Sequence, residues 1–281
     1  MGEYTGQRVF ISGGSLGLGR ALALQLARDG AHVCIAARGR EALDRTLAEM
    51  QAAAGTQATT LIARHVDVTD PAAVEAMAAE AVTALGGLDL LICNQGFAHI
   101  APVTDLPVAD FRRLIEVNYL GHAYLCRAFA PHFIGQRRGR VMMISSVLGY
   151  LGVYGYAPYS ASKWAIVGFA EGLRQELGLH GVTVQVVYPG TIETPGLAQE
   201  NADKPAVVWA MESGSPFNKV RGADDVARRV LRAARGRRFE NPLGWDGWFT
   251  FLASRHLPGL VRWLNDGDLR KAIKQHGGSS G

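Results

Sequence analysis

Apolar residues occur along this chain in short runs of strand length, separated by longer segments with helical spacing. The runs lack strict alternation of apolar and polar residues, which is typical of strands covered on both faces. The predicted strands are residues 8–12, 32–36, 60–65, 88–93, 140–145 and 183–188. The predicted helices are residues 17–29, 40–54, 71–85, 108–135 and 159–181.

This alternation of strand and helix predicts parallel strands joined by right-handed crossovers. The expected fold class is therefore α/β, a single-domain, doubly wound Rossmann fold with a parallel sheet. We find no internal repeat and no long linker, so residues 1–281 are predicted to form one domain, with the Rossmann core at residues 8–190.

The pattern changes after residue 190. Residues 191–222 are rich in loop-forming residues and interrupted by Pro195, Pro205 and Pro216, and a long segment without a strand is typical of a lid over a substrate. Helical spacing resumes in residues 223–276, a C-terminal helical extension that includes an aromatic-rich stretch at 243–264. Residues 277–281 are predicted to be a tail.

Composition narrows the class of protein. The chain is 48% apolar with a formal net charge of +4, and its basic residues form no single block, so we expect no nucleic-acid partner. The excess of basic residues suits an anionic cofactor. Its three cysteines are far apart and form no Cys-x-x-Cys pair, so we expect reduced thiols and no metal site.

The N-terminal residues are polar, and no stretch of eighteen apolar residues occurs. We therefore expect a cytoplasmic protein without a signal peptide or a membrane-spanning helix. The stretch 243–264 carries tryptophans and leucines, yet it is broken by charged residues and Pro258. It could lie at a membrane surface, pack on the sheet or form an oligomer contact.

A glycine-rich loop follows the first predicted strand and begins the first helix. Its glycines are spaced Gly-x-x-x-Gly-x-Gly, which allows a tight turn and a close approach of the backbone to a pyrophosphate. The N–H groups at the helix N-terminus then face the anion. The loop residues expected to bind the cofactor are Gly13, Ser15, Leu16, Gly17, Leu18 and Gly19.

The end of the second predicted strand indicates which nicotinamide cofactor the chain binds. An acidic residue there would bind the ribose 2′-hydroxyl of NAD, but this chain has Arg38, which can pair with a 2′-phosphate. The sequence thus predicts NADP(H). Further binding residues are expected at the ends of the next two strands, namely Asp67, Val68, Asn94 and Gly96.

Candidate chemistry lies on the predicted helix 159–181. Tyr159 and Lys163 are four residues apart and share one face, so the ammonium is expected to lower the pKa of the phenol. Tyr159 would then exchange a proton with a carbonyl oxygen. Ser146 can hydrogen-bond that oxygen, and Asn118 can hold water that connects Lys163 to solvent.

Together these residues resemble the short-chain dehydrogenase/reductase family across about residues 8–196. The resemblance implies catalytic roles for Asn118, Ser146, Tyr159 and Lys163, with the last two also contacting the cofactor. It also implies a dimer or tetramer, and a nicotinamide end formed by Pro189, Gly190, Ile192 and Thr194. Two positions depart from the family pattern, Ser12 in place of threonine and Gln95 in place of alanine.

Residues 150–163 and 194–205 show a narrower resemblance to 3-ketodihydrosphingosine reductases, which reduce a long-chain sphingoid ketone with NADPH. It implies a lipid-like ketone substrate, whose ammonium could meet Glu193 or Glu200. Three alternatives stay open: reduction of another ketone (a 3-oxoacyl thioester, a steroid or a xenobiotic carbonyl), an NADP(H)-sensing protein without turnover, and a membrane-surface scaffold.

Overall fold

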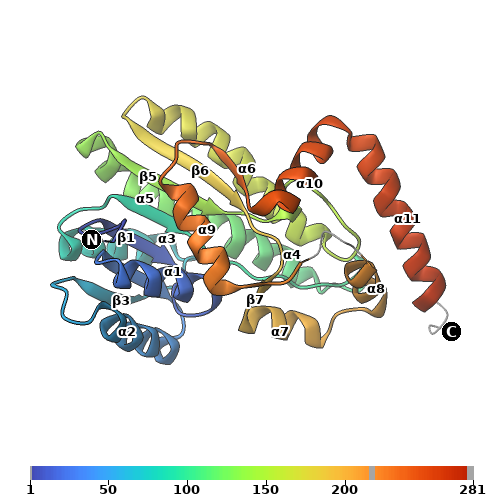
Figure 1. Cartoon of the computed structure of the whole chain (residues 1–281), viewed down its shortest axis with the longest axis horizontal. Helices are drawn as coiled ribbons and strands as arrows, with labels where there is room; N and C mark the ends of the chain where they lie inside the picture. Colours follow the sequence, from blue (N-terminus) through green and yellow to red (C-terminus); the bar gives the residue numbers. More distant parts are fainter. Residues whose placement is uncertain (1, 215–218, 277–281) are drawn as a thin grey trace.

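A computed structural model describes residues 2–214 and 219–276 of the chain (Figure 1). Seven parallel strands form the central sheet in the order β3-β2-β1-β4-β5-β6-β9. They are β1 (Arg8–Ser12), β2 (His32–Ala37), β3 (Leu61–His65), β4 (Leu90–Cys93), β5 (Gly139–Ile144), β6 (Val182–Tyr188) and β9 (Glu240–Pro242). The predicted doubly wound Rossmann fold is confirmed.

Helices cover both faces of this sheet, as Figure 1 shows. One layer contains α1 (Gly17–Arg28), α2 (Arg40–Ala54) and α9 (Ala223–Ala234). The other contains α3 (Pro71–Leu85), α5 (Gly121–Gln136) and α6 (Ala157–Gly178). Each layer encloses its own core, and β4 is buried along its whole length, which explains the unbroken apolar runs in the sequence.

Local sequence sets where several helices begin and end. The side chain of Asp70 accepts hydrogen bonds from the N–H groups of Ala72 and Ala73 and so caps α3, while Pro71 occupies the first turn. At the other end, Gly86 adopts a left-handed conformation with φ of +71°. These signals explain why the predicted bounds of α3 match the observed ones.

The predicted helix at 108–135 contains an irregular turn. It consists of α4 (Val108–Ile115), a π-helical turn η1 (Glu116–Leu120) and α5. Asn118 lies within this turn, and π-helical turns often occur at functional sites. Helical periodicity alone could not reveal the extra residue.

The predicted strandless lid is wrong in detail. Residues 191–222 contain two short helices, α7 (Pro195–Ala202) and α8 (Ala206–Gly214). They also contain β7 (Ile192–Glu193) and β8 (Arg221–Gly222), which pair in parallel. The two ends of the segment therefore pair with each other. Pro216, one of its predicted breaks, lies outside the described residues, as does the tail at 277–281.

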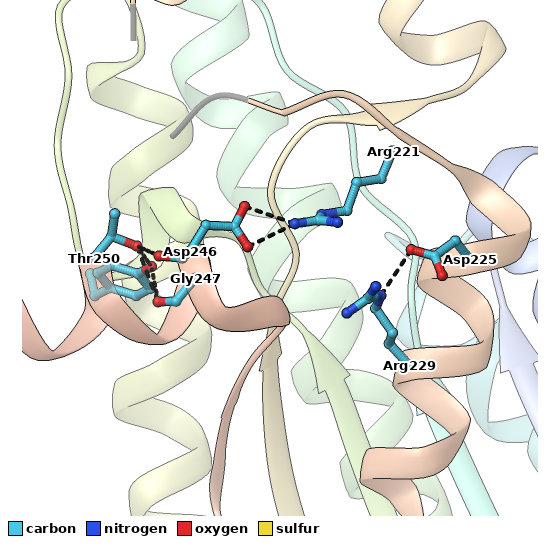
Figure 2. A network of polar contacts seen from close by, with 7 residues as sticks. Arg221, Asp225, Arg229, Asp246, Gly247 and Thr250 are labelled. Atoms are coloured by element: carbon cyan, nitrogen blue, oxygen red, sulfur yellow. Dashed lines mark hydrogen bonds and ion pairs between the residues drawn. The ribbon is translucent and has the colours of Figure 1, made fainter. Parts of the chain in front are cut away.

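The C-terminal extension folds back against the lid and the sheet. It contains α9, β9, α10 (Gly244–His256) and α11 (Pro258–His276), and α11 extends past α10 to reach α8 (Figure 1). Figure 2 shows a link between the lid and the C-terminal extension. Arg221 of β8 donates to both carboxylate oxygens of Asp246 in α10, at 2.7 and 2.8 Å. This nearly buried ion pair joins the end of the lid to the first turn of α10.

The aromatic stretch 243–264 divides into two faces. On the inner face of α10, Phe251 packs edge-on against Tyr150 and contacts Tyr188 of β6. On the outer face, Trp245, Phe249 and Leu252 are 67%, 57% and 47% exposed. Packing on the sheet thus accounts for only part of the apolar surface of this stretch.

Candidate active site

The glycine-rich loop between β1 and α1 leaves no room for side chains at its glycine positions. A Cβ atom at Gly13 would lie 2.9 Å from Cα of Gln95, and one at Gly19 would lie 2.0 Å from the carbonyl oxygen of Gly13. Gly13 and Gly17 also adopt positive φ angles of 63° and 53°. Glycine is required here by both sterics and backbone conformation.

The N-terminus of α1 is open to an anion. Leu16 occupies the N-cap position, so no side-chain cap satisfies the first-turn N–H groups, and no acidic residue lies in that turn. Ser15 is held by a hydrogen bond from the hydroxyl of Thr46 to its carbonyl oxygen at 2.9 Å, while Leu18 is buried inside. The loop fits the diphosphate of a dinucleotide.

Asn94 and Gly96 adjoin this loop from the end of β4. The Asn94 amide donates to the carbonyl oxygens of Ser12 and Gly13 at 3.3 and 3.1 Å, so it holds the loop in shape. A Cβ atom at Gly96 would lie 3.1 Å from Nζ of Lys163. Gly96 therefore brings the backbone close to the second predicted site.

Arg38 and Asp67 lie beyond the ends of β2 and β3. Arg38 is exposed. Burial raises the pKa of Asp67, but hydrogen bonds from the N–H and hydroxyl of Thr69 and the charges of Arg38 and Arg113 together lower it. Val68 is buried against Gly121, where a Cβ atom would lie 2.8 Å from its side chain. The charge of Arg38 thus reaches the edge of the sheet where the adenosine half of a cofactor would bind.

Tyr159, Lys163 and Ser146 come together at the carboxyl end of β5. Nζ of Lys163 lies 5.7 Å from the centre of the Tyr159 ring. The hydroxyls of Ser146 and Tyr159 share a hydrogen bond, and the N–H of Leu148 donates to Oγ of Ser146 at 3.1 Å, which orients it. The structure therefore juxtaposes the three side chains that the sequence singles out.

Burial has the largest effect on the pKa of the Tyr159 phenol in this structure. Burial and the charge of Glu200 raise the pKa of Tyr159 above its ordinary value, although the bond from Ser146 lowers it. Burial also lowers the pKa of Lys163 to about 8. The pKa of Tyr159 is thus raised in this structure, contrary to the expected lowering, because burial disfavours the phenolate.

Asn118 is fully buried in the π-helical turn. Its amide donates to the carbonyl oxygen of Phe97 at 2.9 Å and to the hydroxyl of Ser162 at 3.0 Å, and its carbonyl accepts the N–H of Phe97 at 3.0 Å. Asn118 therefore fixes the loop after β4 against α6, and its role in a water link to Lys163 stays a prediction.

The departure at Gln95 creates a buried chain of hydrogen bonds. The hydroxyl of Ser12 donates to Oε1 of Gln95, and Nε2 of Gln95 lies 3.0 Å from Nδ1 of His122. Since an amide nitrogen can only donate, His122 must accept at Nδ1 and carry its proton on Nε2. Burial and the charge of Lys163 keep the pKa of His122 well below its ordinary value, and its buried Nε2 has no hydrogen-bond partner among the described residues.

The carbonyl oxygen of Ile144 accepts a hydrogen bond from Nζ of Lys163 at 3.1 Å. Ser12 and Gln95 therefore connect the glycine-rich loop to His122, whose pKa is lowered by the charge of Lys163. The sequence revealed the unusual Gln95, in the loop after β4, but offered no signal that His122 of α5 would be its partner.

The start of the lid lies against the glycine-rich loop. The carbonyl oxygen of Pro189 accepts the N–H of Val147 at 3.1 Å, while Gly190 is exposed and Ile192 half-buried. The hydroxyl of Thr194 caps α7 through the N–H of Leu197. A Cβ atom at Gly17 would lie 2.9 Å from the methyl group of Thr194, so the four predicted residues span the path from Ser146 to the loop.

The profile of the family described as short chain dehydrogenase matches residues 7–205. The chain belongs to the short-chain dehydrogenase/reductase family. Members of this family are oxidoreductases that use a nicotinamide cofactor, which agrees with the open helix N-terminus and the glycine cradle.

Individual members of the family give finer comparisons. The chain is 34% identical to 3-ketodihydrosphingosine reductase of Bos taurus, over 86% of this chain and 73% of that one. It is 36% identical to 2-dehydro-3-deoxy-L-rhamnonate dehydrogenase (NAD(+)) of a Sphingomonas species, over 70% and 77%. The crystal structure of levodione reductase superposes with a TM-score of 0.77 at 26% identity, covering 88% of this chain and 99% of that one.

Residues 2–214 and 219–276 contain neither a metal-ligand cluster nor a membrane-spanning helix. No group of three or more His, Cys, Asp or Glu side chains is placed to hold a metal ion. None of the helices there combines the length and the apolar character needed to cross a membrane.

Proposed function

We propose that this chain is an NADPH-dependent reductase that converts 3-ketodihydrosphingosine to dihydrosphingosine. The juxtaposition of Ser146, Tyr159 and Lys163 beside the glycine-rich loop is the observation that supports reduction of a ketone. The similarity to the bovine reductase over most of both chains supports the choice of ketone.

In this proposal the glycine-rich loop binds the diphosphate, and Arg38 pairs with the 2′-phosphate. Asp67, Val68, Asn94 and Gly96 line the adenosine side, and Pro189, Gly190, Ile192 and Thr194 line the nicotinamide side. The bound cofactor supplies a hydride to the carbonyl carbon. Lys163 also holds the nicotinamide ribose.

Tyr159 donates its proton to the carbonyl oxygen, and Ser146 hydrogen-bonds the same oxygen as negative charge develops there. The positive charge of Lys163 stabilises the phenolate that remains. Asn118 keeps the loop after β4 in place and leads the replacement proton toward Lys163. These groups supply proton transfer and charge stabilisation.

We assign residues 191–222 to the substrate lid and residues 223–276 to an extension that supports it. A groove of about 520 Å³ runs between the start of α6, α8 and α11, and its lining includes Val153, Trp164, Met211 and Leu269. Val153 also packs in the small apolar cluster that includes Tyr159. We assign this groove to the long alkyl chain of the substrate, because apolar side chains form most of its lining.

A reductase for another ketone is the second candidate, since the levodione and rhamnonate relatives share the fold. The test is steady-state reduction of 3-ketodihydrosphingosine, a 3-oxoacyl thioester, a steroid ketone and a small soluble ketone, each with NADPH and NADH. We expect the highest kcat/KM for the sphingoid ketone with NADPH. A preference for a small soluble ketone would reject the substrate assignment.

The same assay separates an enzyme from an NADP(H)-sensing protein. Tyr159→Phe should reduce kcat by about 10²- to 10⁴-fold, the usual contribution of a general acid, while NADPH still binds. Wild-type NADPH binding without turnover of any ketone would favour the sensing protein.

A further inference from the structure

A carboxylate from the lid lies close to the proposed proton donor. Glu200, on α7, is half-buried, and the backbone N–H of Ala98 donates a hydrogen bond to its carboxylate. Ala98 packs in the same apolar cluster as Tyr156 and Tyr159. The lid helix thus places Glu200 at the wall of the site, whereas Glu193 on β7 is exposed.

The nearby lysine of the lid already has another carboxylate as its direct partner. Nζ of Lys204 donates to Oε2 of Glu212 at 2.7 Å, and the hydroxyl of Tyr156 donates to Oε1 of the same residue at 2.6 Å. The Lys204 side chain is only 1% exposed. This ion pair is part of the lid, and the charge of Lys204 also acts on Glu200.

The charge of Glu200 acts on the groups that would move the proton. It raises the pKa of Tyr159 and of Tyr156, and it opposes the lowering of the pKa of Lys163. A negative charge beside a proton donor makes the donor a weaker acid. This arrangement disfavours the reduction of an uncharged ketone, but a cation bound between Glu200 and Tyr159 would cancel the effect.

We propose that Glu200 binds the ammonium group of an α-amino ketone and thereby selects this class of substrate. The inference rests on the proposed function, because 3-ketodihydrosphingosine carries its amino group on the carbon next to the carbonyl. A carbonyl at Tyr159 therefore puts the ammonium on the first neighbouring atom. The ammonium supplies a further cation beside the half-buried carboxylate, and it offsets the charge that hinders Tyr159.

The test compares two ketones and three proteins. The ketones are 3-ketodihydrosphingosine and the analogue with hydrogen in place of the amino group. The proteins are the wild type, Glu200→Gln, and the matched control Asp203→Asn, which removes an exposed carboxylate from the same lid. The readouts are kcat/KM for each ketone with NADPH, and the Kd of NADPH as a check that the site is intact.

We expect Glu200→Gln to lower kcat/KM for the amino ketone by about 10- to 100-fold, the range for a hydrogen bond to a charged group. For the uncharged analogue, kcat/KM should stay the same or rise, because Tyr159 loses a neighbouring negative charge. Asp203→Asn should change neither value, and NADPH should bind all three proteins equally.

The outcomes separate this inference from the proposed function. An equal loss for both ketones in Glu200→Gln would overturn the ammonium site and leave the reductase standing. A wild type that reduces the uncharged analogue as well as the amino ketone would do the same. Reduction of neither ketone would overturn the proposed function and the ammonium site with it.

Discussion

Lys163 is held in a site where burial favours its neutral form. Its pKa is lowered to about 8, mainly by burial, with Glu200 opposing the shift. The positive charge is therefore present below about pH 8 and is lost as the pH rises through this value. Since the cofactor is anionic, its affinity should follow the same change.

We predict that the Kd of NADPH increases as the pH is raised from 7 to 9.5, with a midpoint near the lysine pKa. Fluorescence titration of NADPH across this range measures the change. Lys163→Met should bind NADPH weakly at every pH and lack the transition. A transition that persists in this variant would assign the titration to another group.

Arg38 is exposed and close enough to act on Asp67. We predict that Arg38→Asp raises the Kd of NADPH by about 10- to 100-fold, because a charge-assisted contact is replaced by repulsion. NADH should be affected little, since it has no 2′-phosphate. Arg232→Asp makes the same charge change at an exposed position of α9 and should alter neither Kd. Equal losses for both cofactors in Arg38→Asp would contradict the 2′-phosphate contact.

Gln95 and His122 are both buried, so removing either leaves polar groups without a partner. We predict that Gln95→Ala and His122→Ala each lower the free energy of unfolding by about 1–3 kcal/mol. The double variant should lose less than the sum, because the two side chains share one hydrogen bond. Urea unfolding of the four proteins measures the coupling, and strict additivity would show that the bond contributes nothing.

Helices α10 and α11 present an outer apolar surface made of Trp245, Phe249, Leu252, Leu260 and Trp263. In α10, the residues Trp245, Phe249 and Leu252 follow each other at helical spacing, so they share one face. The exposed basic residues Arg255, Arg262, Arg270, Lys271 and Lys274 lie on the same two helices. Tryptophan and leucine beside basic residues suit the headgroup region of an anionic bilayer.

We predict that the full chain floats with vesicles containing anionic lipid and that Trp245→Ser combined with Phe249→Ser abolishes this. Each aromatic side chain contributes about 1.5–3 kcal/mol when it leaves water. Trp164→Ser, at an exposed tryptophan of α6, is the matched control and should float like the wild type. If the wild type does not float with the vesicles, the apolar surface does not bind membrane. A mass in solution larger than that of one chain would then assign this surface to an oligomer contact.

At the scale of the whole molecule, the parallel sheet brings the residues of the candidate site together. Parallel strands all end at one edge, so Ser12, Asn94 and Ser146 meet there although they are far apart in the sequence. The lid then crosses from β6 to the glycine-rich loop, where Thr194 meets Gly17. The expected dimer or tetramer through the long helices stays a prediction, which the mass in solution would test.

The sequence by itself determined the Rossmann fold, because six apolar runs and the helices between them carry a strong local signal. It also singled out the glycine-rich loop, Arg38, Ser146, Tyr159 and Lys163, since their chemistry depends on residue type and spacing. Local sequence was sufficient to predict these features, because each is encoded within one strand, turn or helix.

Only the tertiary structure decided the remaining features. β9 has three residues and includes a proline, so it exists because β6 offers it an edge. The pKa values of Tyr159 and Lys163 depend on burial by distant segments, which reversed the expected effect on the tyrosine. The contacts between Gln95 and His122 and around Glu200 join separate helices and loops, and such contacts follow from packing across the whole chain.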